Sequence, residues 1–141
     1  MNRRDMIAAG AALMALSTAA EAQVSHDHHD AAAANPLFDA ASNCVKAGLV
    51  CMDHCLQTFA AGDASLAACA REVDLMLSTC GTLAKLASLK SSHLPAMAKL
   101  ALAVCQDCDA ECRKHADKHA ACKACGEACA ACAVECKKVA A

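Results

Sequence analysis

Five cysteines near the end of the chain follow one another at intervals of three, four, three and four residues. This alternation is the repeat of a helix that buries one narrow seam against its neighbours. The residues between them are mostly Ala, Lys and Glu, which are good helix formers. Thiols therefore occupy the positions that Leu, Ile or Val fill in most soluble helices. The five are Cys122, Cys125, Cys129, Cys132 and Cys136.

Three earlier segments carry the same spacing, and each predicts another helix. In the first of these helices, Asn35 is expected to be the N-terminal cap and Pro36 the first helical residue. Gly62 is expected to end this helix, and Asp63 to cap the second helix. The third begins near residues 93–95. The seams are Leu37, Ala41, Cys44, Gly48, Cys51 and Cys55; Leu66, Cys69, Val73, Met76, Cys80, Leu83 and Ala87; and Leu94, Ala98, Ala101, Cys105, Cys108, Cys112, His115 and His119.

Four helices of about 20 residues with short connections predict an all-α fold, an antiparallel up-down-up-down four-helix bundle. All thirteen cysteines fall on the predicted seams, so all are expected to point inward and line the core. Residues 35–141 would form this one domain. Met76, on the second seam, is more typical of core packing than of a ligand.

The N-terminal region resembles an export signal. Arg3 and Arg4 precede an apolar run over residues 6–16, and Ala20-Glu21-Ala22 fits a small-residue cleavage site. Paired arginines indicate the twin-arginine route, which carries folded proteins. The apolar run is too short for a membrane helix, which needs about 20 residues. We therefore expect residues 1–22 to be a signal peptide, residues 23–34 a flexible His-containing linker, and the mature protein periplasmic and free of the membrane.

Composition excludes several function classes. The chain has a formal net charge of −2, no Trp or Tyr, and two Phe residues. Nucleic-acid binding has no electrostatic basis in such a chain, and no stacking aromatics either. Thirteen cysteines in 141 residues indicate either a disulfide scaffold or a metal protein.

Three interpretations of the cysteines fit poorly. Thirteen small apolar fillers would bury less surface than leucines and would oxidise. Disulfides suit an exported protein, but thirteen is odd, and pairs such as Cys51 and Cys55 lie on one helix face, where a disulfide torsion is unfavourable. Interhelical disulfides remain open. The spacing of Cys125, Cys129 and Cys132 matches a radical-SAM motif, but that motif works from a loop, whereas this one continues in register on both sides.

Soft-metal binding is the fourth interpretation, and charge favours one metal. Ligating thiols must be thiolates, and no Lys or Arg lies among the central seam positions. About three tetrahedral Zn²⁺ ions would leave roughly seven negative charges unpaired. One Cu(I) per thiolate would neutralise the core completely, and two sulfurs satisfy each ion. The pattern therefore favours Cu(I).

From about Pro36 onward the chain resembles the bacterial copper storage proteins. The resemblance covers the thirteen-cysteine pattern, the turn Gly62-Asp63-Ala64-Ser65, and the segment from Cys122 to Cys129. The leader is similar to that of the exported branch. The resemblance implies storage of many Cu(I) ions per subunit, about one per cysteine, in a homotetramer. It also implies that His54, within Cys51-Met-Asp-His-Cys55, binds copper near the mouth of the bundle.

The opening departs from the family pattern. Exported members can carry methionines on the first helix and the following turn, where this chain has Thr58, Ala61 and Leu66. Antiparallel connectivity would bring His54, His115 and His119 to one end, where imidazole could replace thioether; a solvated helix end is the alternative for the last two. The predicted ligands are Cys44, Cys51, Cys55, Cys69, Cys80, Cys105, Cys108, Cys112, Cys122, Cys125, Cys129, Cys132, Cys136, His54, His115 and His119.

The sequence thus predicts a Cu(I) storage protein that is not an enzyme. The rival is a copper chaperone or detoxification carrier that delivers Cu(I) to an acceptor protein; a surface cysteine pair would favour it. A redox enzyme would need an isolated, exposed thiol of low pKa, and the pattern offers none.

Overall fold

The computed structural model describes residues 35–140, which form four α-helices without any strand. The predicted signal peptide and the linker lie outside the described residues. Among the described helices, none combines the length and apolarity needed to cross a bilayer. The all-α prediction is confirmed. The helices are α1, Pro36–Ala60; α2, Ala67–Ser88; α3, Leu94–Arg113; and α4, Ala120–Val139.

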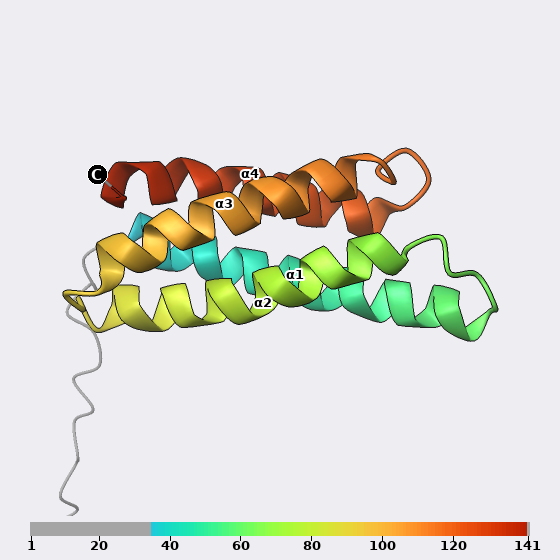
Figure 1. Cartoon of the computed structure of the whole chain (residues 1–141), viewed down its shortest axis with the longest axis horizontal. Coiled ribbons are helices and arrows are strands. Elements are labelled where there is room, and N and C mark those ends of the chain that lie inside the picture. Colours follow the sequence, from blue (N-terminus) through green and yellow to red (C-terminus); the bar gives the residue numbers. More distant parts are fainter. Residues whose placement is uncertain (1–34, 141) are drawn as a thin grey trace, which may run out of the picture. The chain divides into compact units, whose positions relative to one another are not determined.

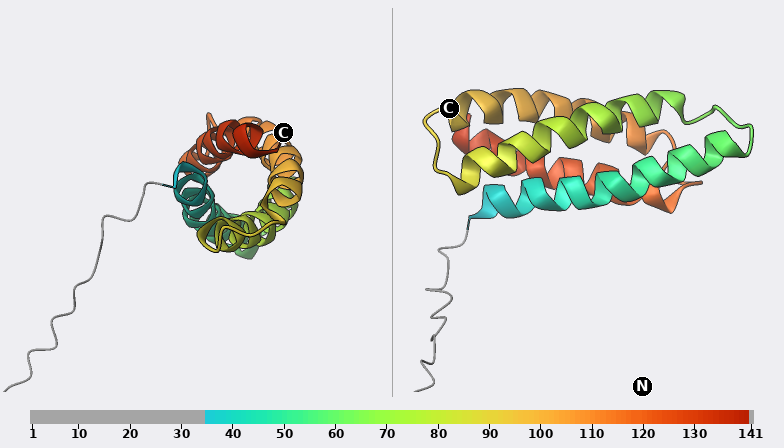
Figure 2. Two further views of the ribbon diagram at one scale, coloured as in Figure 1. Left: turned by 90° about the vertical axis from the view of Figure 1, so that its left-hand side faces the viewer. Right: turned by 90° about the horizontal axis from the view of Figure 1, so that it is seen from below.

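The helices run up, down, up and down around a common core (Figures 1 and 2). Each helix packs chiefly against two neighbours: α1 against α2 and α4, and α3 against α2 and α4. The α1–α2 and α3–α4 connections lie at the same end of the bundle (Figure 1). This end, formed by residues 61–66 and 114–119, is called the mouth end below. The opposite end, with the α2–α3 connection, is called the closed end.

The first helix begins and ends as the sequence predicts. The Asn35 side chain accepts a hydrogen bond from the Phe38 backbone N–H at 3.1 Å, and Pro36 occupies the first helical turn. At the other end Gly62 has a φ of 84°, a conformation that glycine adopts without strain. The chain therefore leaves α1 in a tight turn immediately before Asp63.

Asp63 does not cap the second helix, contrary to the prediction. Its Oδ1 accepts a hydrogen bond from the Ser65 backbone N–H at 2.8 Å, which closes a local turn instead. The helix starts four residues later, at Ala67, and its cap residue Leu66 makes no side-chain capping bond. Leu66 is fully buried. Burial of this leucine, rather than a polar cap, fixes where α2 begins.

The third helix is shorter than predicted. It ends at Arg113, and residues 114–118 form turns, so His115 and His119 do not continue its seam as helical residues. His119 instead has extended backbone angles, φ −130° and ψ 100°, and precedes the first residue of α4. The two histidines thus belong to the α3–α4 connection. They still lie at the mouth end.

The closed end is filled largely by hydrocarbon side chains. Buried leucines and alanines from α1, α2 and α3 occupy the seam positions there, while Cys136 lies near the same end on α4. Such packing stabilises the bundle through the hydrophobic effect and needs no metal. These residues are Leu37, Ala41, Leu83, Ala87, Ala98 and Ala101.

Two mid-helix glycines offer a matched test of the packing. A Cβ placed on Gly48 would lie 2.5 Å from Met76 Cε and 2.8 Å from Leu77 Cδ2, whereas one on Gly81 would meet nothing within 4 Å. We expect Gly81→Ala to stabilise the reduced apo-protein by about 0.5–1 kcal/mol through helix propensity. Gly48→Ala gains the same propensity but overpacks the core, which costs about 1–3 kcal/mol.

Urea denaturation of both variants, followed by circular dichroism, measures the difference. Equal stability of the two variants would show that Met76 and Leu77 move aside freely.

Candidate metal centre

All thirteen cysteines have no solvent-exposed surface, and all are free thiols. The expectation that they point inward is therefore met. Three come from α1, two from α2, three from α3 and five from α4. The three-four spacing places these side chains on the inner stripe of each helix, because residues three and four apart share a helix face.

One group draws a cysteine from each helix. Cys44, Cys80, Cys105 and Cys132 have sulfurs that all lie within 4.8 Å of one another. The Cys80 and Cys105 sulfurs are 3.5 Å apart. The Cys44 thiol also donates to the Ala128 carbonyl at 3.1 Å. This four-sulfur group, called the inner group below, lies nearer the closed end.

Three further groups lie nearer the mouth end and share members. Cys51 belongs to two of them and Cys125 to two, so the sulfurs form a connected series rather than separate sites. Cys69 contacts both Cys112 and Cys122 at 3.8 Å. A soft metal ion could therefore pass between neighbouring sulfurs along this part of the core. The groups are Cys51, Cys69 and Cys122; Cys51, Cys112 and Cys125; and Cys108, Cys125 and Cys129.

The core contains no compensating charge. No polar or charged side chain is buried within residues 35–140, and every Lys and Arg in that range is exposed. A thiolate in this interior would have no cationic partner from the chain, and an unpaired buried charge is strongly unfavourable. Protons or bound metal cations must supply the neutralising charge.

Nine thiols have raised pKa values. Burial raises the pKa of Cys55 to about 11 and that of Cys122 to about 12. Hydrogen bonds among neighbouring thiols, together with burial, raise the pKa of seven more. These are Cys44, Cys51, Cys80, Cys108, Cys112, Cys129 and Cys136.

The remaining four thiols have lowered pKa values, because neighbouring thiols would donate hydrogen bonds to the thiolate. Cys105 and Cys132 are in the inner group, Cys125 joins two of the groups near the mouth end, and Cys69 belongs to a third. Every sulfur group thus contains at least one thiol that loses its proton more readily than its neighbours.

The three predicted histidines gather at the mouth end. His54 Nε2 and His119 Nδ1 are 2.8 Å apart, although 65 residues separate them in the sequence. The His115 and His119 ring centroids are 6.3 Å apart. All three side chains are half-buried. The expectation that antiparallel connectivity brings these histidines to one end is confirmed. Copper binding by them stays a prediction.

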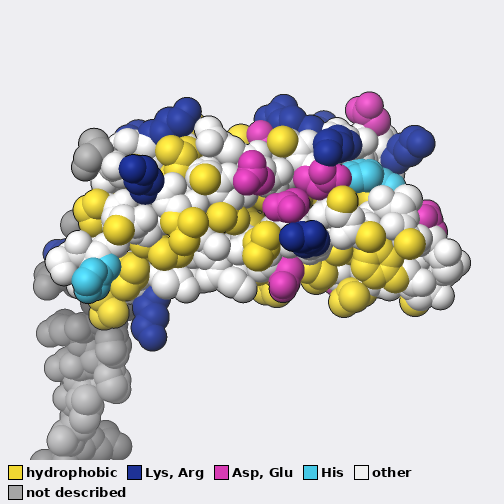
Figure 3. All heavy atoms as spheres, in the orientation of Figure 1, with side chains coloured by type: hydrophobic (Ala, Val, Ile, Leu, Met, Phe, Trp, Pro, Cys, Tyr) yellow, Lys and Arg dark blue, Asp and Glu magenta, His cyan; other side chains and the backbone are white. Residues whose placement is uncertain are grey.

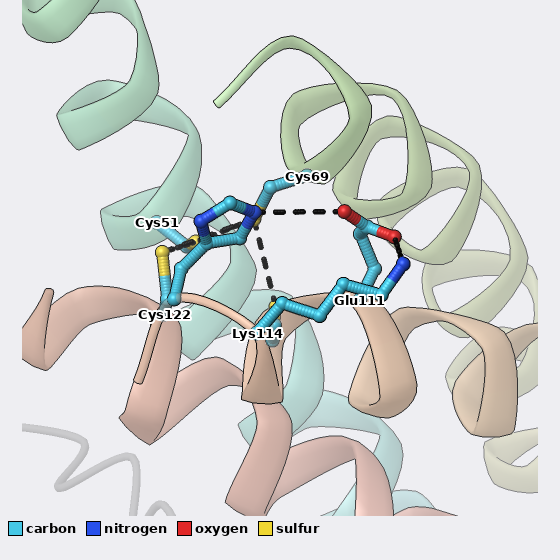
Figure 4. Close-up of polar contacts among 7 residues, drawn as sticks. Cys51, Cys69, Glu111, Lys114 and Cys122 are labelled. Carbon is cyan, nitrogen blue, oxygen red and sulfur yellow. Dashed lines mark hydrogen bonds and ion pairs between the residues drawn. The ribbon is translucent and has the colours of Figure 1, made fainter. Parts of the chain in front are cut away.

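Glu111 is a polar neighbour of this site that sequence reasoning missed. Its Oε1 lies 3.5 Å from His115 Nε2, an atom that is buried and makes no hydrogen bond within the described chain. Figure 4 shows that Lys114 also contacts the Glu111 carboxylate. The signal in the sequence was the four-residue spacing between Glu111 and His115, which places them on one face of a helical turn.

Comparison with known proteins identifies one family and similar solved structures. The family model described as copper storage protein matches residues 29–141. Apo-Csp3, copper storage protein 3 from Bacillus subtilis, is 29% identical with a TM-score of 0.66, covering 75% of this chain and 97% of that one. The Cu(I)-bound copper storage protein BsCsp3 is 29% identical with a TM-score of 0.64, covering 74% and 95%. No curated protein matches the chain.

Proton release tests the electrostatics of the core. Because nine thiols have raised pKa values, they are protonated near neutral pH and must lose those protons when metal binds. We expect at least nine protons to be released as Cu(I) fills the thirteen thiols. Anaerobic titration in a weakly buffered solution, with pH-stat detection, measures this number. Release of only a few protons would mean that the apo core already carries many thiolates.

Proposed function

Because this chain belongs to the copper storage protein family, we propose that its thirteen core cysteines are the ligands of stored Cu(I). The protein binds multiple Cu(I) ions in the interior of a four-helix bundle, at about one ion per thiolate. The observation that carries the proposal is the set of connected sulfur groups in a core that buries no cation.

Charge and geometry support Cu(I) over Zn²⁺. A Zn²⁺ ion in the inner group would hold four thiolates and leave two negative charges without a partner, because no buried cation lies nearby. A Cu(I) ion balances one thiolate, is soft, and binds well to two or three sulfurs. The three-sulfur groups near the mouth end suit that preference. Filling the core with Cu(I) therefore leaves it neutral.

Titration of the reduced apo-protein with Cu(I) under anaerobic conditions tests this function. We expect saturation at about thirteen ions per chain, because each thiolate is neutralised by one ion. A competing Cu(I) chelator with a coloured complex reports the end point, and the same titration with Zn²⁺ is the control. Saturation at three or four ions, with Zn²⁺ competing effectively, would contradict Cu(I) storage.

We place copper entry at the mouth end. The closed end is filled largely by leucine and alanine side chains and offers only Cys136 of α4 as a ligand, whereas His54, His115 and His119 lie at the other end. Imidazole binds Cu(I) less tightly than a pair of thiolates, so it can hold an ion that is passing inward. Cys55 and Cys122, both near this end of their helices, would be among the first thiols to receive it.

Removing the three imidazoles should change rates more than capacity. We expect His54→Ala/His115→Ala/His119→Ala to lose at most a few ions, while the rate of Cu(I) removal by a small chelator changes severalfold. His93→Ala is the matched control, since His93 is exposed and lies at the closed end. Unchanged rates in the triple variant would show that copper enters elsewhere.

Export and assembly are further parts of the proposal. The paired arginines, the short apolar run and the cleavage-like Ala20-Glu21-Ala22 support twin-arginine export to the periplasm. N-terminal sequencing of the protein from the periplasmic fraction tests this.

Leu49, Val50 and Leu56 support a homotetramer, because each is more than half exposed on the outside of α1. Apolar side chains also gather on the face shown in Figure 3. A light-scattering mass tests the tetramer.

We further infer storage without catalysis. A chaperone or carrier that hands Cu(I) to an acceptor protein would present a surface cysteine pair, and a redox enzyme would present a reactive thiol. Here every cysteine is buried. An acceptor protein for the released copper is compatible with storage, but it would take the ion at the mouth end.

A further inference from the structure

The second helix has a long interval without a thiol. Cys69 and Cys80 are its only cysteines, eleven residues apart, and the inward positions between them are Val73 and Met76. Both are fully buried. Met76 is therefore a sulfur-containing side chain inside the core, at the place where α2 offers no cysteine.

Helix geometry gives the level of Met76 along the bundle. The inner group places Cys44, Cys80, Cys105 and Cys132 at one level. One helical turn nearer the mouth end, about 5–6 Å away, the next inward residue of each helix follows from the antiparallel directions. These residues are Gly48 on α1, Met76 on α2, Cys108 on α3 and Cys129 on α4.

Gly48 explains how the methionine is seated. A Cβ on Gly48 would lie 2.5 Å from Met76 Cε, so the end of the methionine side chain fills the space that the glycine leaves. The sulfur comes one bond before this methyl group in the side chain. It therefore lies between the backbones of α2 and α1, within the bundle.

The chemistry of this level is suited to Cu(I). Cys108 and Cys129, together with Cys125, have sulfurs within 4.8 Å of one another. A thioether is a soft ligand that adds no charge, so it can raise the coordination of a Cu(I) ion without disturbing the neutral balance of thiolates and ions. The sequence alone favoured Met76 as core packing; its depth and its pairing with Gly48 add the reason to revise that interpretation.

We propose that the Met76 thioether is a Cu(I) ligand at the level of Cys108 and Cys129. The inference rests on the proposed binding of Cu(I) by the core thiols. It makes Met76 a fourteenth sulfur ligand, on the side of the core where α1 and α2 lack cysteine. Because the thioether is neutral, it changes how tightly copper is held at this level and not how many ions are stored.

Selenium X-ray absorption of the full chain, labelled with selenomethionine and loaded with Cu(I), tests the proposal. We expect copper scattering at bonding distance from selenium in the loaded protein and none in the apo-protein. Met76→Leu should abolish this signal, whereas Met97→Leu, at a half-buried position near the start of α3, should keep it. Leucine is close to methionine in volume, so the bundle should still fold.

A second readout is the rate at which a chelator removes copper. Met76→Leu should leave the number of bound ions unchanged and release copper severalfold faster than Met97→Leu. A loaded protein that holds about thirteen ions but shows no selenium–copper scattering, or keeps it in Met76→Leu, would overturn the role of Met76 alone. If the unsubstituted protein does not bind Cu(I) at all, the proposed function itself is overturned.

Discussion

A thiolate in a protein interior has to be neutralised, either by a proton or by a metal cation, because an isolated charge there is strongly unfavourable. In this bundle the chain supplies no cation: all Lys and Arg side chains of residues 35–140 are exposed. The core is therefore neutral in two forms, with protons on sulfur or with Cu(I) on sulfur. Exchange of one monovalent cation for another leaves the electrostatics unchanged, so loading does not require a different fold.

This exchange is possible because much of the hydrophobic packing needs no metal. Leucines and alanines of α1, α2 and α3 fill most of the closed end and stabilise the bundle with or without metal. Thiols occupy most of the remaining core, beside Leu66, Val73 and Met76, and pack as small apolar groups while protonated. The histidines form the boundary with solvent at the mouth end, where His54 of α1 and His119 of the α3–α4 connection are in contact.

The seams could be predicted from the sequence because helical periodicity is a local property of the chain. Every predicted seam residue between Leu37 and Ala87 is buried. The cap of the second helix was predicted wrongly, because tertiary packing decides it: Asp63 closes a turn instead of capping α2, which begins after the buried Leu66. The antiparallel connectivity was enough to predict that His54 and His119 lie at the same end of the bundle. The grouping of the sulfurs could not be predicted, because it depends on the relative heights of the helices.

Sulfur is spread unevenly over the four helices. The last two helices carry eight of the thirteen cysteines. They approach closely at Gly126, where a Cβ would lie 3.3 Å from Cys112 Cβ and 3.0 Å from Asp109 Oδ1. This approach brings thiols of α3 and α4 into the same sulfur groups. On the opposite side, Gly48 makes room for a methionine instead. The two glycines thus have different roles. Gly126 brings the thiols of two helices together, whereas Gly48 leaves space for the neutral sulfur of Met76, at a place where a further thiolate would need another cation.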